Sequence, residues 1–447
     1  MTDEKRYRWY KDLNGYQWFV LLVAALGWLF DCLDQQLFIL ARQPAMAELL
    51  PGTPTQAQID EYGGYATAIF LMGWAIGGLV FGVLGDRIGR AKTMIITILL
   101  YSLFTGLSAL SVGFADFCLY RFMTGLGVGG EFAVGVALVA EVMPDRARPY
   151  CLSVLQALSA VGNISAALIG MSMGTLREHG LVESIWRPMF VVGALPALLA
   201  LVIRARLKEP ERWQQVSHEG DVARKLGSYR ELFGHPTWRR HAFIGLGLAF
   251  SGIVGLWGIG FFTFDLVGNV LRERFVEDGQ TEMQVAGSVA HWKAIASMMM
   301  NIGAAFGMYG FAILAQRMGR KSTFAIAFIA AMVSTASVFF FLSEFHQIFW
   351  MVPIMGFCIL SLFAGYAIYF PELFPTHLRS TGTSFCYNVG RFVAAVGPAL
   401  LGWLTGQVYA DTSDPLRYAG LTMCGIFVLG LLVLPFAPET KDQPLPD

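Results

Sequence analysis

The sequence predicts an all-α polytopic membrane protein with twelve transmembrane helices in two pseudo-symmetric six-helix bundles. Three observations predict this fold class. The 447 residues are 55% hydrophobic and only 14% charged, whereas a soluble domain carries about 25% charged residues. Apolar runs of about 20 residues, the length that crosses a bilayer, recur along the chain. Two polar motifs also recur at nearly the same offset, which indicates that the halves are repeats.

Twelve candidate spans divide the chain into five regions. An N-terminal segment (1–16) precedes the N-terminal bundle (17–205), and a linker (206–240) separates it from the C-terminal bundle (241–437) and the tail (438–447). The spans are expected near 17–41, 64–84, 93–112, 116–140, 150–173, 187–205, 241–264, 289–313, 322–343, 347–370, 381–405 and 417–437.

Basic residues predict the orientation of these spans. One set of loops holds Arg87, Arg90, Arg146 and Arg148, and the alternate loops are acidic or mixed. Short basic loops stay on the cytoplasmic side. We therefore expect a multi-pass protein of the cell membrane with both termini cytoplasmic, acting as a monomer.

Composition also argues against several partners and cofactors. Lys plus Arg equals Asp plus Glu, 32 of each, so no bulk charge indicates a nucleic-acid partner. The six cysteines lie in apolar segments without paired spacing, so neither a disulfide framework nor a metal site is expected. The first apolar run is too long for a cleavable signal peptide. We expect no cofactor.

Two motifs recur between the halves. GDRIGR at 85–90 and AQRMGR at 315–320 are 230 residues apart. EVMPDRAR at 141–148 and ELFPTHLR at 372–379 are 231 residues apart, and both fit Glu-x-x-Pro-x-x-x-Arg. Recurrence at nearly the same offset and at matching topological positions predicts two parallel six-helix halves.

On these motifs the chain resembles the major facilitator superfamily of secondary transporters over essentially its whole length. GVLGDRIGRAK at 82–92 is similar to the family's loop signature Gly-x-Leu-Ala-Asp-Arg-x-Gly-Arg-Lys, with Gly85 and Ala91 as departures, and Gln316 replaces the acid in the second copy. Three stretches resemble proton-coupled organic-acid carriers of the aromatic-acid and sialic-acid symporter groups: Asp31-x-x-Asp34, RFMTGLGVGGE at 121–131, and YFPELFPTHLRSTG at 369–382 leading into CYNVGR at 386–391.

Four charged residues in the first and fourth spans are predicted to couple transport to protons: Asp31, Asp34, Arg121 and Glu131. Charged groups inside a bilayer are costly and usually functional. A helical rise of about 1.5 Å per residue puts Asp31 and Arg121 at similar depths. An Asp31–Arg121 ion pair is therefore expected, and the resemblance to sugar carriers of the superfamily implies the same pairing.

Two carboxylates beside one arginine predict a proton switch, because protonating one leaves the other to hold Arg121 and biases inward- against outward-facing states. The alternative is a static ion pair that fixes helix packing. Asp31 is the expected partner. The repeat counterpart of Asp34 is Asp265, near a helix end with Lys293 as its possible partner, so Asp34 would mark the outer rim.

Glu131 lies deeper than Arg121, towards the cytoplasmic third of its span. Its alternative role is an ion pair with a loop arginine, Arg87 or Arg90. The C-terminal half lacks both charges at the matching positions, Val352 and Leu362. Proton chemistry is therefore expected in the N-terminal half.

Arg391 is predicted to bind an anionic group of the substrate. It lies ten residues into the eleventh span, near the membrane midplane, and its planar guanidinium suits a carboxylate. The alternative is an ion pair with an acid of the N-terminal half. Five residues are expected as cavity neighbours, and the aromatic ones could serve packing instead: Asn388, Tyr387, Tyr366, Tyr369 and Asn301.

The charged loops are predicted to form a cytoplasmic gate, a role that the resemblance also implies. A glycine in the motif permits a tight turn. The gate should be weaker in the C-terminal half, where Gln316 removes the acid. The alternative is a positive-inside anchor. The gate residues expected are Gly85, Asp86, Arg87, Gly89, Arg90, Glu141, Arg148, Arg317, Arg320, Glu372 and Arg379.

We therefore expect a secondary active transporter that moves a small organic solute, a carboxylate-bearing metabolite, by alternating access with proton symport. The alternatives are a symporter of neutral sugars or polyols, or an exporter. VGNISAALIGMSMG at 161–174 lacks the proline of the drug-antiporter signature, which weakens the exporter. A membrane-bound sensor or enzyme is not expected, because the polar segments contain no catalytic set, metal cluster or phosphate loop. The expected partners are the lipid bilayer, the substrate and the proton.

Overall fold

A computed structural model describes residues 7–179, 181–198, 206–279, 281–394 and 396–446. Every regular element in these residues is a helix. Within them, ten helical segments are long and apolar enough to cross a membrane. The two further predicted spans, 187–205 and 381–405, each include residues outside the described ranges, as does the predicted segment 1–16.

The chain divides into two compact units. Unit 1 contains Met1–Arg239, Ala367–Asn388 and Thr440–Asp447, and unit 2 contains Arg240–Tyr366 and Val389–Glu439. Segment 367–388 belongs to the second sequence repeat but packs within unit 1. Compact units and sequence repeats therefore differ, and both copies of Glu-x-x-Pro-x-x-x-Arg lie in unit 1.

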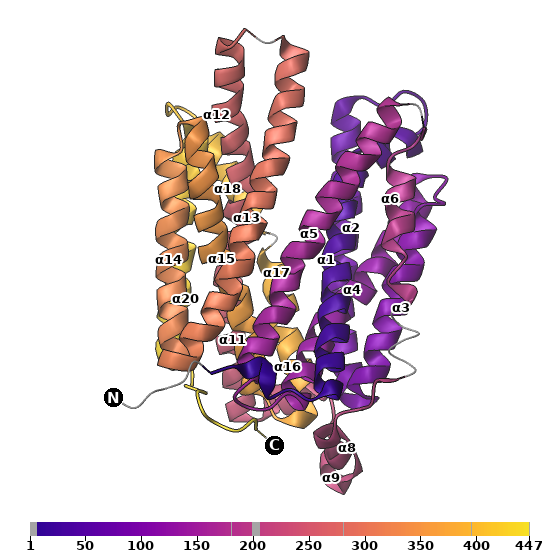
Figure 1. Ribbon diagram of the computed structural model, residues 1–447, viewed down its shortest axis with the longest axis vertical. Coiled ribbons are helices and arrows are strands. Elements are labelled where there is room, and N and C mark those ends of the chain that lie inside the picture. Colours follow the sequence, from indigo (N-terminus) through magenta and orange to yellow (C-terminus); the bar gives the residue numbers. More distant parts are fainter. Residues whose placement is uncertain (1–6, 180, 199–205, 280, 395, 447) are drawn as a thin grey trace. The chain divides into compact units, whose positions relative to one another are not determined.

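In unit 1, α4 packs against α2 and α3, and α1 packs against α5 and α4; these helices are the indigo-to-magenta ribbons of Figure 1. Nearly every α4 side chain from Gly125 to Ala140 is buried, so α4 forms the centre of this unit. Among the described residues of this unit, the five helices of membrane-spanning length are α1 (Gly15–Leu49), α2 (Gln56–Arg87), α3 (Arg90–Ser108), α4 (Phe114–Val142) and α5 (Arg148–Glu178). The shorter helix α6 (Trp186–Gly193) follows them.

Small residues allow α2 and α4 to approach closely. A Cβ on Gly77 would lie 2.0 Å from the carbonyl oxygen of Leu126, and a Cβ on Gly129 would lie 2.0 Å from that of Trp74. Helices that associate in lipid rely on such small residues, because no hydrophobic effect drives them together. The glycine-rich run in α4 therefore brings its charged residues close to neighbouring helices.

The rest of unit 1 consists of short helices from the termini, the linker and the second repeat. These are η1 (Trp9–Lys11), α8 (Glu211–His218), α9 (Gly220–Ala223), α10 (Tyr229–Gly234), η4 (Thr376–Leu378), α16 (Arg379–Ser384) and the π-helix η5 (Phe385–Val389), whose last residue belongs to unit 2. Among them, α16 packs against α2 and α4.

In unit 2, α12 packs against α13, and α14 packs against α19 and α20. The helices are α11 (Pro236–Val254), η2 (Gly255–Ile259), η3 (Gly260–Phe262), α12 (Thr263–Glu277), α13 (Glu282–Met318), α14 (Arg320–Phe341), α15 (Phe345–Leu373), α17 (Gly390–Ala394), α18 (Val396–Trp403), η6 (Leu404–Val408), α19 (Pro415–Met423), α20 (Ile426–Val433) and η7 (Leu434–Phe436). The first residues of α11 and the last of α15 belong to unit 1.

Several helices extend beyond their predicted apolar spans. The first was expected to end at 41, but α1 continues to Leu49. The eighth was expected from 289, but α13 begins at Glu282, where Thr281 and Gln284 form a capping box. An apolar run reports the thickness of the bilayer, whereas polar caps decide where the helix ends.

Candidate functional site

A buried ion pair joins α1 and α4 within unit 1. Arg121 Nη1 lies 3.6 Å from Asp34 Oδ2, and both side chains are fully buried. Thr105 Oγ1 of α3 donates to Asp34 Oδ1 at 2.7 Å. Arg121 donates from Nε and Nη2 to Ser108 Oγ at 3.0 and 2.8 Å. A buried pair is tolerated only when its other polar atoms find partners, and α3 supplies them.

Aromatic rings complete the surroundings of Arg121. The guanidinium carbon lies 4.5 Å from the ring centre of Phe190 and 5.6 Å from that of Phe38. A cation close to an aromatic ring is attracted by the ring quadrupole, more strongly when water is excluded. Arg121 also donates from Nη2 to the Phe104 carbonyl at 3.5 Å, so one carboxylate, one hydroxyl, one carbonyl and two rings hold it.

The expectation that Asp31 is the preferred partner of Arg121 is wrong, as is the expectation that Asp34 marks the outer rim. The ion pair that forms is with Asp34, which is completely buried. Because α1 continues to Leu49, Asp34 lies well inside the helix. Depth arithmetic also cannot separate residues one turn apart, since a turn of about 5.4 Å is no larger than the error in a predicted helix end.

Glu131 and Asp31 lie in the same unit and are almost completely buried, at 1% and 2% exposure. The Glu131 carboxylate packs against Gly27 of α1, where a Cβ would lie 2.3 Å from Oε1. Neither Glu131 oxygen forms a hydrogen bond in the described part of the chain. The alternative of an ion pair between Glu131 and a loop arginine is not formed, since Arg87 and Arg90 contact other groups.

Sequence reasoning missed the contribution of α3. Thr97, Tyr101, Thr105 and Ser108 are all buried and recur at steps of four, four and three residues. This spacing places them on one helix face. A polar stripe at helical spacing inside an apolar span was the signal that could have identified them.

A second buried cluster, which we call the Arg90 network, consists of Asp86, Arg90, Glu141 and Arg379. Arg90 Nη2 lies 2.8 Å from Glu141 Oε1 and 3.1 Å from Asp86 Oδ1. Arg379 Nη1 lies 2.8 Å from the same Glu141 oxygen. All four side chains are fully buried. All four belong to the predicted cytoplasmic gate, and the structure brings them together within unit 1.

Asp86 also anchors the segment from the second repeat. Its carboxylate accepts hydrogen bonds from Ser380 N at 3.1 Å, Thr381 N at 2.8 Å and Thr381 Oγ1 at 2.6 Å. The backbone donors belong to the first turn of α16, where N–H groups lack partners within the helix. A carboxylate here satisfies them and complements the helix dipole.

The two Glu-x-x-Pro-x-x-x-Arg motifs fold alike around their arginines. Arg148 Nε donates to the carbonyl of Ala140 at 2.8 Å, and Arg379 Nε donates to that of Pro371 at 3.2 Å, eight residues back in each case. Burial lowers the pKa of Arg379 to about 10, although the Glu141 carboxylate opposes the shift. Arg379 therefore stays charged at neutral pH.

Sequence reasoning also missed two capping glutamates. Glu209 accepts from the backbone N–H groups of Ala91 and Lys92, both at 3.1 Å, at the start of α3. Glu439 accepts from those of Arg320 and Lys321, at 2.9 and 3.1 Å, at the start of α14. A glycine with positive φ precedes each helix: Gly89, at 112°, precedes α3, and Gly319, at 92°, precedes α14. The offset of 230 between the glutamates matches that of the loop motif and was the available signal.

The other predicted gate residues contact several different groups. The carbonyls of Gly85 and Ala315 accept from Arg90 Nη1 at 2.9 Å and from Arg320 Nη1 at 3.2 Å. Arg87 Nε donates to Leu226 O at 3.2 Å, and Arg148 contacts Asp145. Glu372 Oε2 accepts from Thr440 Oγ1 at 2.5 Å. The Arg317 side chain is exposed. Arg317 and Arg320 belong to unit 2.

The predicted substrate-binding residues fall in both units. Tyr387, Tyr369 and Asn388 belong to unit 1, whereas Tyr366, Asn301 and Arg391 belong to unit 2. Asn388 Nδ2 donates to Ser384 Oγ at 2.9 Å, and Tyr387 stacks on Phe132 with ring centres 4.1 Å apart. Tyr366 is fully buried, and its hydroxyl donates to Leu248 O at 2.7 Å. Packing, the alternative role, describes both tyrosines in this structure. Asn301 Nδ2 donates to Ser297 O at 2.9 Å, and Arg391 is half-buried.

Two further features lie near helix ends. The predicted contact of Asp265 with Lys293 is confirmed at 3.0 Å, with both side chains partly exposed.

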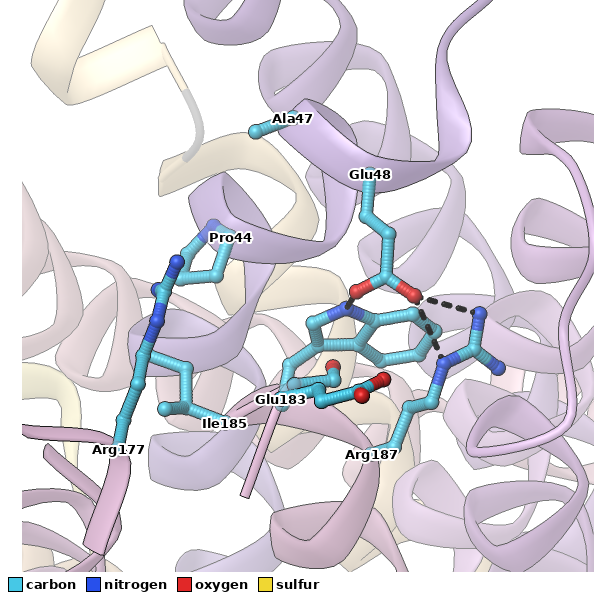
Figure 2. A pocket seen from close by; sticks show the side chains of 9 residues that line it. Pro44, Ala47, Glu48, Arg177, Glu183, Ile185 and Arg187 are labelled. Carbon is cyan, nitrogen blue, oxygen red and sulfur yellow. Dashed lines mark hydrogen bonds and ion pairs between the residues drawn. The ribbon is translucent and has the colours of Figure 1, made fainter. Parts of the chain in front are cut away.

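In unit 1, a pocket of about 470 Å³ opens beside the end of α1. There Glu48 accepts from Trp186 Nε1 at 2.7 Å and from Arg187 Nε at 2.9 Å; Figure 2 shows Arg177 on the opposite side. Among the described residues, no His, Cys, Asp and Glu group could hold a metal ion.

Long apolar helices with buried charges in their interior are typical of multi-pass membrane proteins that move a solute or ion. The family model of the Major Facilitator Superfamily matches residues 24–279 and 275–447, and the chain belongs to this superfamily. It is therefore a transporter and not an enzyme.

Three comparisons illustrate this membership. The chain is 30% identical over 444 residues to a protein of Haemophilus influenzae designated a metabolite transport protein, covering 97% of this chain and 99% of the relative. It is 27% identical to the cis,cis-muconate transport protein of Acinetobacter baylyi, covering 93% and 94%. The solved structure of the proton:xylose symporter XylE superposes with a TM-score of 0.75 at 18% identity, covering 96% and 98%; this likeness concerns the fold.

Proposed function

We propose that this chain imports a small organic anion, a carboxylate-bearing metabolite, together with protons, by alternating access. The observation that carries the proposal is the buried Asp34–Arg121 ion pair, with Asp31 and Glu131 buried in the same unit. Ionisable groups inside a membrane are expensive to bury and are by default functional. A static pair needs one acid per arginine, whereas this unit buries three acids within its first and fourth spans.

Proton binding to Asp34 would change what holds Arg121. With Asp34 ionised, Arg121 joins α4 to α1 through the carboxylate. With Asp34 protonated, Arg121 keeps its contacts with the Ser108 hydroxyl, the Phe104 carbonyl and the aromatic rings but loses the carboxylate charge. The two protonation states thus favour different packings of α1 against α4, and a ligand that binds one state better shifts the equilibrium.

A carboxylate is the substrate class that two observations support. The relative from Acinetobacter is named for cis,cis-muconate, which is a dicarboxylate. Arg391 supplies a half-buried guanidinium in the second repeat, and a guanidinium binds a carboxylate through two parallel hydrogen bonds. Arg391 is therefore the proposed contact for the anionic group.

The Arg90 network is the proposed cytoplasmic gate. It links the ends of α2, α3 and α4 to segment 376–381 through buried ion pairs. Release of that segment requires these pairs to separate and their charges to be hydrated. The basic loops support a cytoplasmic location for this cluster and for both termini.

Uptake into proteoliposomes under an imposed pH gradient tests the coupling. Asp34→Asn keeps the shape of the side chain but removes its proton site, so gradient-driven accumulation of a labelled carboxylate should fall at least tenfold. Asp265→Asn is the matched control, because Asp265 is the repeat counterpart of Asp34 and forms an exposed pair. Undiminished accumulation by Asp34→Asn, Asp31→Asn and Glu131→Gln would contradict proton coupling.

Thermal stabilisation of the purified protein tests the substrate class. A panel of mono- and dicarboxylates should raise the melting temperature, and neutral sugars of similar size should not. Arg391→Lys keeps the charge but loses the planar fork, and should weaken stabilisation by carboxylates. Equal stabilisation by sugars and acids would favour a neutral substrate instead.

A further inference from the structure

Tyr101 of α3 is a buried titratable residue that the proposed mechanism does not yet use. Its side chain is completely buried. It packs against Gly127 of α4, where a Cβ would lie 2.7 Å from Tyr101 N and 2.8 Å from Tyr101 Cβ. Glu131 lies one helical turn after Gly127, so Tyr101 sits beside the part of α4 that carries this carboxylate.

The same residue is adjacent to the Asp34–Arg121 ion pair. Thr105 lies one turn after Tyr101 on the same face of α3, and its hydroxyl donates to Asp34 at 2.7 Å. On α1, Gly27 receives the Glu131 carboxylate and lies seven residues, two turns, before Asp34. Tyr101 therefore lies on α3 between the level of Glu131 and the level of Asp34, and α3 contacts both α4 and α1.

The Tyr101 hydroxyl has unused hydrogen-bonding capacity. Its oxygen is buried without a well-formed hydrogen bond in the described part of the chain, although Ser102 lies close by. It is near enough to Glu131, Asp31 and Asp34 to interact electrostatically with each of them. A phenol can donate one hydrogen bond and accept others, so it suits a place among carboxylates that are not all protonated.

We propose that Tyr101 is a positioning residue of the proton site, whose hydroxyl donates a hydrogen bond to whichever neighbouring carboxylate is ionised. The inference rests on the proposed proton coupling and deepens it. A donor that follows the negative charge stabilises the ionised form and joins Glu131 and the Asp34–Arg121 pair into one titrating unit. Protons then bind to the group of acids rather than to each acid separately.

Tyr101→Phe tests the proposal, because it removes the hydroxyl and keeps the ring. Without the donor, the carboxylates hold protons up to higher pH, so the pH midpoint of uptake should rise by about one unit, a tenfold change in proton binding. The KM for the carboxylate at saturating proton concentration should stay within about twofold. Tyr120→Phe is the matched control, since this tyrosine of α4 packs on Phe104.

A second variant gives the opposite sign and protects the test against poor folding. Site-specific 3-fluorotyrosine at position 101 keeps the shape and makes the phenol a stronger donor, so the midpoint should move to lower pH. If both variants superimpose on the native profile while Asp34→Asn abolishes coupling, the role of Tyr101 is refuted and the proposed function stands. If Asp34→Asn and Glu131→Gln leave pH-driven uptake intact, the proton coupling itself fails, and this inference fails with it.

Discussion

The two copies of the loop motif, GDRIGR and AQRMGR, have the same helix-end geometry but differ in their charges. In each copy a glycine with positive φ starts a helix, a distant glutamate caps it, and the arginine donates to the carbonyl five residues back. Only the first copy has an acid, Asp86, where the second has Gln316. The motif therefore combines a capping device with a separate ionic function.

The second pair of motifs differs in a related way. Glu141 accepts from two buried arginines, Arg90 and Arg379. Glu372, its repeat counterpart, accepts from the Thr440 hydroxyl, and Arg379 Nη2 donates to Pro446 O at 2.8 Å. In the second copy the C-terminal tail thus contacts both motif residues. The two copies present the same residue types to different partners.

Removing the shared acid should give the largest effect. Glu141→Gln leaves Arg90 and Arg379 buried with only Asp86 to balance them, and losing one partner of a buried pair costs about 3–5 kcal/mol. Glu372→Gln, at the matched position, should cost about 1 kcal/mol, one hydrogen bond. Thermal unfolding in detergent measures both. Equal losses would show that the two copies are energetically alike.

Exchanging the residue that distinguishes the loop copies should have an intermediate effect. Asp86→Asn weakens three hydrogen bonds to a charged acceptor and its pair with Arg90, and should cost about 2 kcal/mol. Gln316→Asp places an acid at a half-buried position, where a change should stay within about 0.5 kcal/mol. The same unfolding assay applies. A large stabilisation by Gln316→Asp would mean that the second copy can hold a network too.

These comparisons show which parts of the molecule the sequence can predict. Span positions follow from apolar length, and the Arg90 network follows from two motifs with one offset. The partner of Arg121 did not follow, because rotation about the helix axis and the true end of α1 decide between Asp31 and Asp34. Tyr101 and Thr105 belong to a polar stripe that is visible in the sequence, but the groups that they face follow only when α3 is known to lie against α1 and α4.

Removing the caps should give smaller and equal effects. Glu209→Gln and Glu439→Gln each weaken two backbone hydrogen bonds at a helix start, and a lost cap costs about 1 kcal/mol. Hydrogen exchange of the first-turn amides of α3 and α14 measures the fraying directly. A much larger loss of amide protection for one variant than for the other would mean that the two repeats differ in helix capping as well as in their ion pairs.

The smallest effect on stability is expected at the sixth position of the Glu-x-x-Pro-x-x-x-Arg motif. This position holds Arg146 in the first copy and His377 in the second. Arg146 lies 4.3 Å from the ring centre of Tyr7 and is always charged. Burial lowers the pKa of the His377 imidazole, and Lys225, Arg379 and His235 lower it further. The Glu231 carboxylate acts in the opposite direction and raises it. The unfolded chain then binds the proton more readily, so stability falls as pH drops below about 6.5.

His377→Asn should flatten this pH dependence by removing the titrating group. Melting temperatures of the native and variant proteins should differ in slope between pH 7.5 and 5, and should run parallel above pH 7.5. Arg146→Gln, the control at the matched position, should lower stability equally at all these pH values, because a guanidinium does not titrate there. A native slope that survives His377→Asn would show that a group other than His377 causes the acid sensitivity.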